Sequence, residues 1–284
     1  MKRRKLKIIK ASHTGFCFGV KRAVGTAENF LKKNKKAYSI GEIIHNPVVV
    51  KELSVKGLKV ISDIRKAKGS YAVVRSHGIS PQIKKRARAL SVKLIDATCP
   101  FVKRSHAIVT LLKKQGYEIV IIGEKNHPEV KALIEVAGSG SSVVTKIQDL
   151  SKLRLRNKKL GVIAQTTLSR DKFFEITDSI LQLDCLEYRI FNTICNDVIK
   201  RQKEAKELAK KVDAVLVIGG KISANTRHLA QICKHQGVKT HHIETEKELQ
   251  ANWFKKVHSI GVVSGASTPS KIVEDTIKRL KKIS

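Results

Sequence analysis

Three cysteines recur with similar neighbours, and thiolates at matched positions could together hold a metal ion or an iron–sulfur cluster. Cys17, Cys99 and Cys195 each stand three residues before a valine, and basic residues follow. A lone cysteine is usually a small buried side chain, but its repetition at three matched positions favours one shared site. Thiolates bind iron–sulfur clusters and zinc alike, so the spacing leaves both open. Cys185 and Cys233 lack the pattern, and we predict structural roles for them.

The repeat extends into two sets of loops that carry polar side chains. Counting 24 residues from each cysteine reaches a glycine at the end of an apolar run: Gly41, Gly123 and Gly219. Four residues later stand His45, His127 and Ser223. Two residues beyond these are Pro47, Glu129 and Asn225. A second set follows later apolar runs: Ser76-His77-Gly78, Gln165-Thr166-Thr167 and Gly265-Ala266-Ser267. Three units of about ninety residues indicate pseudo-symmetric subdomains.

Several side chains in these loops could bind an anion. The imidazoles of His45, His77 and His127 can donate hydrogen bonds to phosphate oxygens, and several of them around one anion would favour their protonated forms. Neutral donors are added by Ser223, Asn225 and Ser267. The chain has neither a glycine-rich phosphate fingerprint nor a P-loop. Recurrence at the repeat positions therefore predicts a phosphate-binding site of another kind.

Glu129 is the one carboxylate at the matched positions, and a carboxylate there could move protons. Thr167 could relay a proton through its hydroxyl group. The simpler alternative for Glu129 is a helix-capping role, because it falls in the first turn after Pro128, where a carboxylate favours the helix dipole. Its place in the repeat favours function.

Strands and helices alternate around these loops. Apolar spacing predicts helices just after each cysteine, over Val20–Leu31, Val102–Leu112 and Val198–Leu208. Short apolar strands follow, over Ala37–Ile40, Glu118–Ile122 and Ala214–Ile218. Further elements are a strand over Lys5–Lys10 and helices over Pro47–Lys56, Pro128–Val136 and Ala224–His235. This order predicts an α/β fold with mainly parallel sheets, whose functional loops lie beyond the carboxyl ends of the strands.

No low-complexity linker separates the repeats, so we expect them to pack tightly around a shared centre. The predicted α/β subdomains span residues 13–98, 99–194 and 195–284. Residues 1–12 are predicted to form a strand that packs near the third subdomain.

Composition limits the class of protein. The 284 residues are 42% hydrophobic, which is enough for real cores. No apolar run approaches the roughly 18 to 20 residues of a membrane span. Five widely spaced cysteines argue against a disulfide framework, so we expect a soluble cytoplasmic protein. The excess of 57 Lys and Arg over 24 Asp and Glu gives a net charge of +33, which would suit nucleic acid, anionic substrates or acidic partners.

Seven ordered motifs closely resemble the 4-hydroxy-3-methylbut-2-enyl diphosphate reductase family over nearly the whole chain. They are Gly15-Phe16-Cys17-Phe18-Gly19-Val20, Ile44-His45-Asn46, Ser76-His77-Gly78, Asp96-Ala97-Thr98-Cys99-Pro100, His127-Pro128-Glu129-Val130, Gln165-Thr166-Thr167-Leu168 and Gly265-Ala266-Ser267. That family acts on the methylerythritol phosphate route to isoprenoids. The resemblance implies three pseudo-symmetric α/β subdomains in a trefoil around one central 4Fe-4S cluster.

The resemblance also implies a role for each candidate residue. Cys17, Cys99 and Cys195 would ligate three irons, and the fourth iron would bind the allylic hydroxyl of (E)-4-hydroxy-3-methylbut-2-enyl diphosphate. The diphosphate would be held by His45, His77, His127, Ser223, Asn225 and Ser267. Glu129, helped by Thr167 beside the substrate, would deliver protons for loss of the hydroxyl as water. Two electrons from a reduced ferredoxin or flavodoxin would yield isopentenyl and dimethylallyl diphosphates.

Two positions depart from the usual sequence of that family, and we expect neither change to remove the activity. Ala224 stands where a second serine is common. After Cys195 the chain reads Asn196-Asp197-Val198, where Ala-Thr is usual following an intervening residue.

Two other functions stay open from the sequence. The net charge of +33 alone indicates a basic nucleic-acid-binding protein with a structural metal site. An aromatic content of 5% and the lack of a recognised module oppose this alternative, so we expect no nucleic-acid partner, and no membrane partner either. A zinc hydrolase would require stoichiometric zinc and activity without a reductant.

Overall fold

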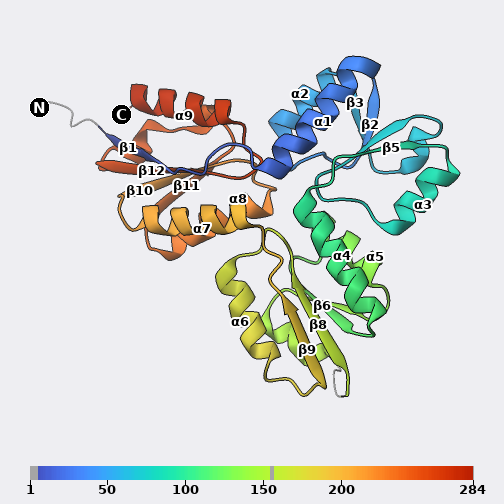
Figure 1. Cartoon of the computed structure of the whole chain (residues 1–284). Coiled ribbons are helices and arrows are strands. Elements are labelled where there is room, and N and C mark those ends of the chain that lie inside the picture. The colour runs from blue at the N-terminus through green and yellow to red at the C-terminus, as the bar shows by residue number, and fades with distance from the viewer. Residues whose placement is uncertain (1–5, 154–156, 284) are drawn as a thin grey trace, which may run out of the picture. The chain divides into compact units, whose positions relative to one another are not determined.

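The computed structural model describes residues 6–153 and 157–283, in which helices and strands alternate along the chain (Figure 1). In this part of the chain, the strands form three separate four-stranded sheets. Every strand pairing described is parallel. The predicted α/β fold with mainly parallel sheets is confirmed.

The three sheets share one strand order. The first runs β3 (Leu58–Ile61), β2 (Ala37–Ile40), β4 (Tyr71–Val74), β5 (Lys93–Asp96). The second runs β7 (Ser141–Val144), β6 (Glu118–Ile122), β8 (Lys159–Ala164), β9 (Glu187–Phe191). The third runs β11 (Lys239–Ile243), β10 (Ala214–Ile218), β12 (Ser259–Ser264), β1 (Lys7–Lys10). The N-terminal strand thus takes the edge position in the third sheet that β5 and β9 take in the others.

The strands predicted over residues 37–40, 118–122 and 214–218 have the bounds that the sequence indicated. β1 begins at Lys7, and Lys5, where the prediction placed its start, lies outside the described residues.

All six predicted helices are present. Three begin at the residue directly after a candidate cysteine: α1 (Phe18–Asn34), α4 (Pro100–Lys114) and α7 (Asn196–Ala209). Three follow the first central strand of a sheet: α2 (Pro47–Val55), α5 (Pro128–Ala137) and α8 (Ala224–His235). The other helices are α3 (Pro81–Ala89), α6 (Arg170–Ile180) and α9 (Ser270–Ile283). Short 3-10 turns are η1 (Ile64–Ala67), η2 (Ile147–Lys152), η3 (Glu246–Glu248) and η4 (Ala251–Phe254). No helix among the described residues has the length and apolar character needed to cross a membrane.

The chain groups into two compact units, and the first contains the third sheet. This unit comprises Met1–Val20, His45–Val49 and Asn196–Ser284. Alternate residues of β10 enter different cores, because successive side chains point to opposite faces of a strand. Leu216 packs in a cluster with Leu280 of α9, whereas Val217 packs in a cluster with Leu229 of α8. Apolar burial on both faces explains the continuous apolar sequence of β10.

The second unit, Lys21–Ile44 and Val50–Cys195, contains the other two sheets. In one, Ile121 of β6 packs with Leu112 of α4 and Leu133 of α5. In the other, Val74 of β4 packs with Ala87 of α3. The subdomain boundaries at residues 98 and 194 stay predictions.

Candidate functional site

The predicted binding residues follow the two central strands of each sheet. His45 and His77 come after β2 and β4, and the same placement recurs in the other two sheets. In the second sheet the residues are His127, Glu129 and Thr167. In the third they are Ser223, Asn225 and Ser267. Neighbouring parallel strands end at one edge of a sheet, where α/β proteins place their ligand-binding loops.

The recurring glycines are needed where two of these loops approach each other. At Gly41, where φ is 75°, an added Cβ would lie 2.6 Å from Nη1 of Arg75. At Gly219, where φ is 144°, it would lie 2.4 Å from Oγ1 of Thr268. In both cases the obstructing residue belongs to the loop after the other central strand. A glycine therefore lets the two loops pack together.

Each candidate cysteine is joined to one of these loops by a backbone hydrogen bond. Cys17 N–H donates to Ala266 O at 3.0 Å, and Cys99 N–H donates to Ser76 O at 3.0 Å. Cys195 N–H donates to Thr166 O at 2.9 Å. The three accepting residues directly precede Ser267, His77 and Thr167. The strand order explains the match, because β1, β5 and β9 lie beside β12, β4 and β8.

The three thiols stand at helix N-termini. Cys17 Sγ accepts from Val20 N at 3.4 Å, and Cys99 is the N-cap residue of α4. Cys195 directly precedes the first residue of α7. Backbone N–H groups and the helix dipole favour negative charge on sulfur at such positions. All three cysteines are half-buried and none forms a disulfide in the described part of the chain, and such donors suit a thiolate-bound cluster.

The two remaining cysteines have different surroundings. Cys233 is fully buried in a hydrophobic core, and this burial raises the pKa of its thiol to about 12. The thiol therefore stays protonated near neutral pH. Cys185 is half-buried, and its Sγ donates to Glu187 O at 3.6 Å. These contacts agree with structural roles for both.

Residues at the starts of α2, α5 and α8 cap the helices, and two of them are predicted diphosphate ligands. His127 Nδ1 accepts from Glu129 N at 3.2 Å, and Ser223 Oγ accepts from Thr226 N at 3.4 Å. Asn46 Oδ1 accepts from the N–H group of Val48 at 3.1 Å. Capping in this way leaves His127 Nε2–H and the hydroxyl hydrogen of Ser223 to donate elsewhere. The helix N-termini add a field that favours anions.

The candidates fall into two sets, one in each compact unit. The first unit holds Cys17, His45, Ser223, Asn225 and Ser267. The second holds His77, Cys99, His127, Glu129, Thr167 and Cys195. Within the second, the rings of His77 and His127 meet edge to face with centroids 5.3 Å apart. Within the first, Ser267 Oγ donates to His45 O at 3.1 Å, so its hydroxyl would have to rotate to bind a phosphate oxygen.

Asn225 is the candidate that most clearly lacks a protein partner. Its side chain is 3% exposed, and neither Nδ2 nor Oδ1 forms a hydrogen bond within the described residues. A buried amide without partners is costly and calls for an explanation, such as a ligand that completes the site. Oγ1 of Thr226, the next residue, is also buried without a hydrogen bond within the described residues.

Replacing Asn225 with alanine is expected to weaken substrate binding without destabilising the protein. The KM should rise about tenfold or more, as expected for a lost hydrogen bond to a charged group. The melting temperature should hold, since no protein hydrogen bond is lost. Thr177→Val on α6 is the matched control, because Thr177 Oγ1 is also buried without a partner in the described chain but lies outside these loops. An unchanged KM in Asn225→Ala would remove this residue from the site.

Glu129 is fully buried and is held by one threonine. Its Oε1 accepts from Thr166 N at 2.8 Å, and its Oε2 accepts from Thr166 Oγ1 at 2.7 Å. Burial raises the pKa of Glu129 to about 7, while the hydrogen bonds from Thr166 oppose the rise. A carboxyl group with this pKa can both hold and release a proton near neutral pH.

Thr167, the predicted helper of Glu129, contacts a different side chain. Its Oγ1 accepts from Gln165 Nε2 at 2.7 Å, and Gln165 Oε1 accepts from Glu124 N at 2.9 Å. Accepting from Gln165 leaves the Thr167 hydroxyl hydrogen to donate. The direct partner of Glu129 is therefore Thr166, and the role of Thr167 stays a prediction.

Removing the Thr166 hydroxyl is expected to shift the pH dependence of activity upward. Because the hydrogen bond from that hydroxyl lowers the pKa of Glu129, Thr166→Val should raise it. In the predicted role of Glu129 as proton donor, the protonated form is the active one, so kcat/KM should fall as pH rises through the pKa, and the fall should begin at higher pH in the variant. The profile measured from about pH 6 to 9 checks this. Thr166→Ser keeps the hydroxyl and should retain the original profile.

Arg75 is a further residue that the repeat comparison did not single out. It directly precedes Ser76 and His77, and burial lowers the pKa of its guanidinium. Its Nε donates to Gly78 O at 3.4 Å, across the loop that carries His77. The sequence did offer a signal for Arg75, because it is a charged residue in a loop that follows an apolar strand.

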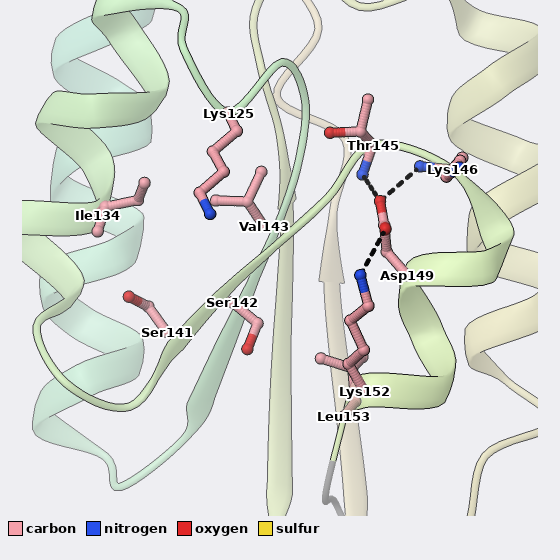
Figure 2. Close-up of a pocket in the computed structure, with 10 residues that line it drawn as sticks. All are labelled: Lys125, Ile134, Ser141, Ser142, Val143, Thr145, Lys146, Asp149, Lys152 and Leu153. Atoms are coloured by element: carbon pink, nitrogen blue, oxygen red, sulfur yellow. Dashed lines mark hydrogen bonds and ion pairs between the residues drawn. The ribbon is translucent and has the colours of Figure 1, made fainter.

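A pocket of about 600 Å³ in the second unit is lined in part by the loop after β6 but by none of the predicted site residues (Figure 2). It opens over β7, with Lys125, Lys146 and Lys152 among its lining residues. Asp149 accepts from the backbone N–H of Lys146 at 3.1 Å and pairs with Lys152 Nζ at 3.6 Å. The pocket contains none of the predicted site residues, so we do not assign it to the site.

Comparisons with known proteins agree over nearly the full chain. The family model described as LytB protein matches residues 8–281. Among curated proteins, the 4-hydroxy-3-methylbut-2-enyl diphosphate reductase of Pelobacter propionicus is 41% identical over 278 residues, covering 98% of this chain and 99% of the relative. The enzyme of the same name from Aquifex aeolicus is 42% identical over 280 residues, covering 97% and 96%.

Solved structures show the same similarity. The E-1-hydroxy-2-methyl-but-2-enyl-4-diphosphate reductase of Plasmodium falciparum superposes with a TM-score of 0.91 at 32% identity, covering 97% of this chain and 87% of that one. A structure described as (E)-4-hydroxy-3-methyl-but-2-enyl diphosphate reductase, the terminal enzyme of the non-mevalonate pathway, gives a TM-score of 0.70 at 41% identity. It covers 98% of this chain and 99% of the other.

Proposed function

Because this chain belongs to the LytB protein family, we propose that it is a 4-hydroxy-3-methylbut-2-enyl diphosphate reductase. It would remove the allylic hydroxyl of (E)-4-hydroxy-3-methylbut-2-enyl diphosphate in a two-electron reduction. The products would be isopentenyl and dimethylallyl diphosphates, and the hydroxyl would leave as water.

The proposed cofactor is one 4Fe-4S cluster held by Cys17, Cys99 and Cys195. The observation that carries the proposal is the matched environment of these residues. Each is a cysteine at a helix N-terminus, and each donates its backbone N–H to a loop that carries a predicted binding residue. Thiolates are the usual ligands of such clusters, so the donor set fits the group. When bound, the cluster would supply the electrons for the reduction.

The substrate diphosphate would be bound by the histidine, serine and asparagine side chains of the central-strand loops. Asn225 supports this assignment, because its buried amide is unpaired within the described residues and can both donate and accept. His127 and Ser223 support it because their capping bonds use acceptor atoms and leave hydrogens to donate. Their positions at helix N-termini would stabilise the negative charge further.

Glu129 would supply the protons that convert the leaving hydroxyl to water and complete the product. Its raised pKa, near 7, allows the protonated acid to be present at neutral pH. Thr166 fixes both carboxyl oxygens, so the side chain is oriented before the substrate binds. We propose Thr167 as the hydroxyl group between the substrate and Glu129.

The electron donor is proposed to be a reduced ferredoxin or flavodoxin. Such donors are usually acidic, and the net charge of +33 offers complementary attraction. The bimolecular rate of electron transfer should therefore fall several-fold as salt rises from about 0.05 to 0.5 M, because salt screens long-range attraction. Stopped-flow reduction of the enzyme by a ferredoxin measures this rate. A rate that ignores ionic strength would exclude steering by charge.

A cytoplasmic place of action is also proposed. No disulfide joins any of the five cysteines, all of which lie in the described residues, and a reducing compartment keeps cysteines in this state.

The direct test is turnover under anaerobic conditions with the allylic diphosphate and a chemically reduced mediator. The expected result is formation of both five-carbon diphosphates, dependent on the reductant. Conversion without reductant would instead support a hydrolase, and no conversion by cluster-loaded protein would contradict the proposal.

A further inference from the structure

We propose that Arg22 and Arg201 are positioning residues that fix the segments entering Cys99 and Cys17. Each guanidinium would hold its segment in place before the cluster binds, so that the two thiolates are preorganised. The proposal rests on the proposed function, because its consequence is tighter retention of the cluster.

Arg22 lies in the second turn of α1 and reaches the residues just before Cys99. Its Nη1 donates to Thr98 O at 2.8 Å, and its Nη2 donates to Asp96 O at 3.2 Å. The same turn is closed from within, because Asp96 Oδ1 accepts from Thr98 N at 2.9 Å. One planar guanidinium thus binds two carbonyl oxygens of a three-residue segment.

Arg201 of α7 binds the residues just before Cys17 in the same way. Its side chain is nearly fully buried. Nη1 donates to His13 O at 2.9 Å and to Ser264 O at 3.2 Å, and Nη2 donates to Gly15 O at 3.0 Å. Nε pairs with Asp197 at 2.6 Å, so the departure from the usual family sequence at Asp197 provides the counter-charge.

A second residue of α7, Glu204, binds the same segment through its side-chain carboxylate. Glu204 Oε2 accepts from His13 N at 2.9 Å, and Glu204 Oε1 lies 2.6 Å from His13 Nδ1. The N–H and C=O groups of His13 are therefore both bound by α7. A segment held at this many points has little freedom to move.

The same kind of contact between a helix and a cysteine-containing segment occurs twice. The helix that begins after Cys195 holds the segment entering Cys17, and the helix that begins after Cys17 holds the segment entering Cys99. Arg104 occupies the position after Cys99 that Arg22 occupies after Cys17, but it is exposed. The segment entering Cys195 is bound instead by Thr193, whose Oγ1 accepts from Ala164 N at 2.8 Å.

Charge neutralisation alone does not account for Arg201. Only part of its donor set faces Asp197, while three donor contacts reach backbone carbonyls in two segments. Backbone carbonyls carry no net charge and gain from the geometry of the guanidinium fork. Arg201 therefore holds two backbone segments together, and we call such an arginine a clamp.

The test compares Arg22→Gln with Arg104→Gln as the matched control. In folded, cluster-free protein, alkylation of Cys99 by iodoacetamide is followed by mass analysis of its peptide. Arg22→Gln should speed this reaction about tenfold, since it removes charge-assisted hydrogen bonds, and Arg104→Gln should leave it unchanged. In cluster-loaded protein, iron loss to a chelator should accelerate in Arg22→Gln only. Equal alkylation rates in the two variants would overturn the proposal.

Arg201→Lys separates positioning from general loosening, because lysine keeps the charge but not the fork. It should speed alkylation of Cys17 and leave Cys99 at the wild-type rate, whereas Arg22→Gln should do the reverse. Faster reaction of both cysteines in either variant would assign these arginines a general structural role and contradict the proposal. If wild-type protein takes up no cluster, the proposed function fails, yet the alkylation rates still test the clamps.

Discussion

Replacing Cys99 with serine should remove most of the bound iron and sulfide and lower reductase activity more than about a hundredfold, since changing even the residues behind a metal ligand costs ten- to a hundredfold. A serine hydroxyl keeps its proton at neutral pH and does not replace a thiolate ligand. Cys99 is half-buried, and its side chain forms no capping hydrogen bond to α4, so the helix should persist. Iron, acid-labile sulfide and the visible spectrum of anaerobic protein measure the effect.

Cys185→Ser is the matched control for this change. Cys185 is also half-buried, but it lies outside the repeat, and its Sγ donates to Glu187 O at 3.6 Å. The variant should keep its iron and its activity. Loss of iron in Cys185→Ser, or full iron in Cys99→Ser, would contradict the assignment of ligand and structural cysteines.

The second large effect is expected from Glu129→Gln, which should lower kcat by about a hundredfold to ten-thousandfold, the usual contribution of proton transfer. The amide can keep both contacts to Thr166 but cannot transfer a proton. Iron content and substrate affinity should stay near wild type. Single-turnover kinetics with pre-reduced protein separate the chemical step from electron supply.

The same variant has a predicted effect on stability. Burial raises the pKa of Glu129 from 4.5 to about 7, so the folded state holds more protons than the unfolded state between those values. The carboxyl group therefore costs stability increasingly as pH rises through this range and in full above it. Glu129→Gln should be more stable than wild type above about pH 7.

Normal turnover by Glu129→Gln would exclude Glu129 as the proton donor.

Much of the fold could be predicted because central strands have a simple pattern. β10 is buried along its length, and its sequence Ala-Val-Leu-Val-Ile marks both ends. The edge strand β11 could not be found in this way. β11 reads Lys-Thr-His-His-Ile with only one fully buried residue, so neither alternation nor a continuous apolar run identifies it.

The repeat itself was visible, because three cysteines with similar neighbours each precede a predicted helix. Each cysteine follows an edge strand of one sheet and precedes the helix that leads to a central strand of the next. The subdomain boundaries at residues 98 and 194 stay predictions. Cys17 follows β1, which pairs with β12 from the far end of the chain. The sequence placed this strand near the third subdomain, but it did not indicate which strand β1 pairs with.

The candidate site shows a similar limit. Matched spacing identified Glu129, but its contact with Thr166 depends on the register of β6 and β8, which the sequence does not state. The repeat did not single out Arg201, which is buried because α7 packs against the segment entering Cys17. An internal repeat identifies residues at matching sequence positions. The contacts that an arginine or a helix cap makes depend on which segments the fold brings next to it.

The measurement that tests the central claim most directly is iron and acid-labile sulfide per chain in anaerobically purified protein, with a visible spectrum before and after adding the hydroxylated allylic diphosphate. We expect about four of each per chain and a change in the spectrum when the substrate binds. Stoichiometric zinc, or no iron after anaerobic reconstitution, would contradict a cluster held by Cys17, Cys99 and Cys195.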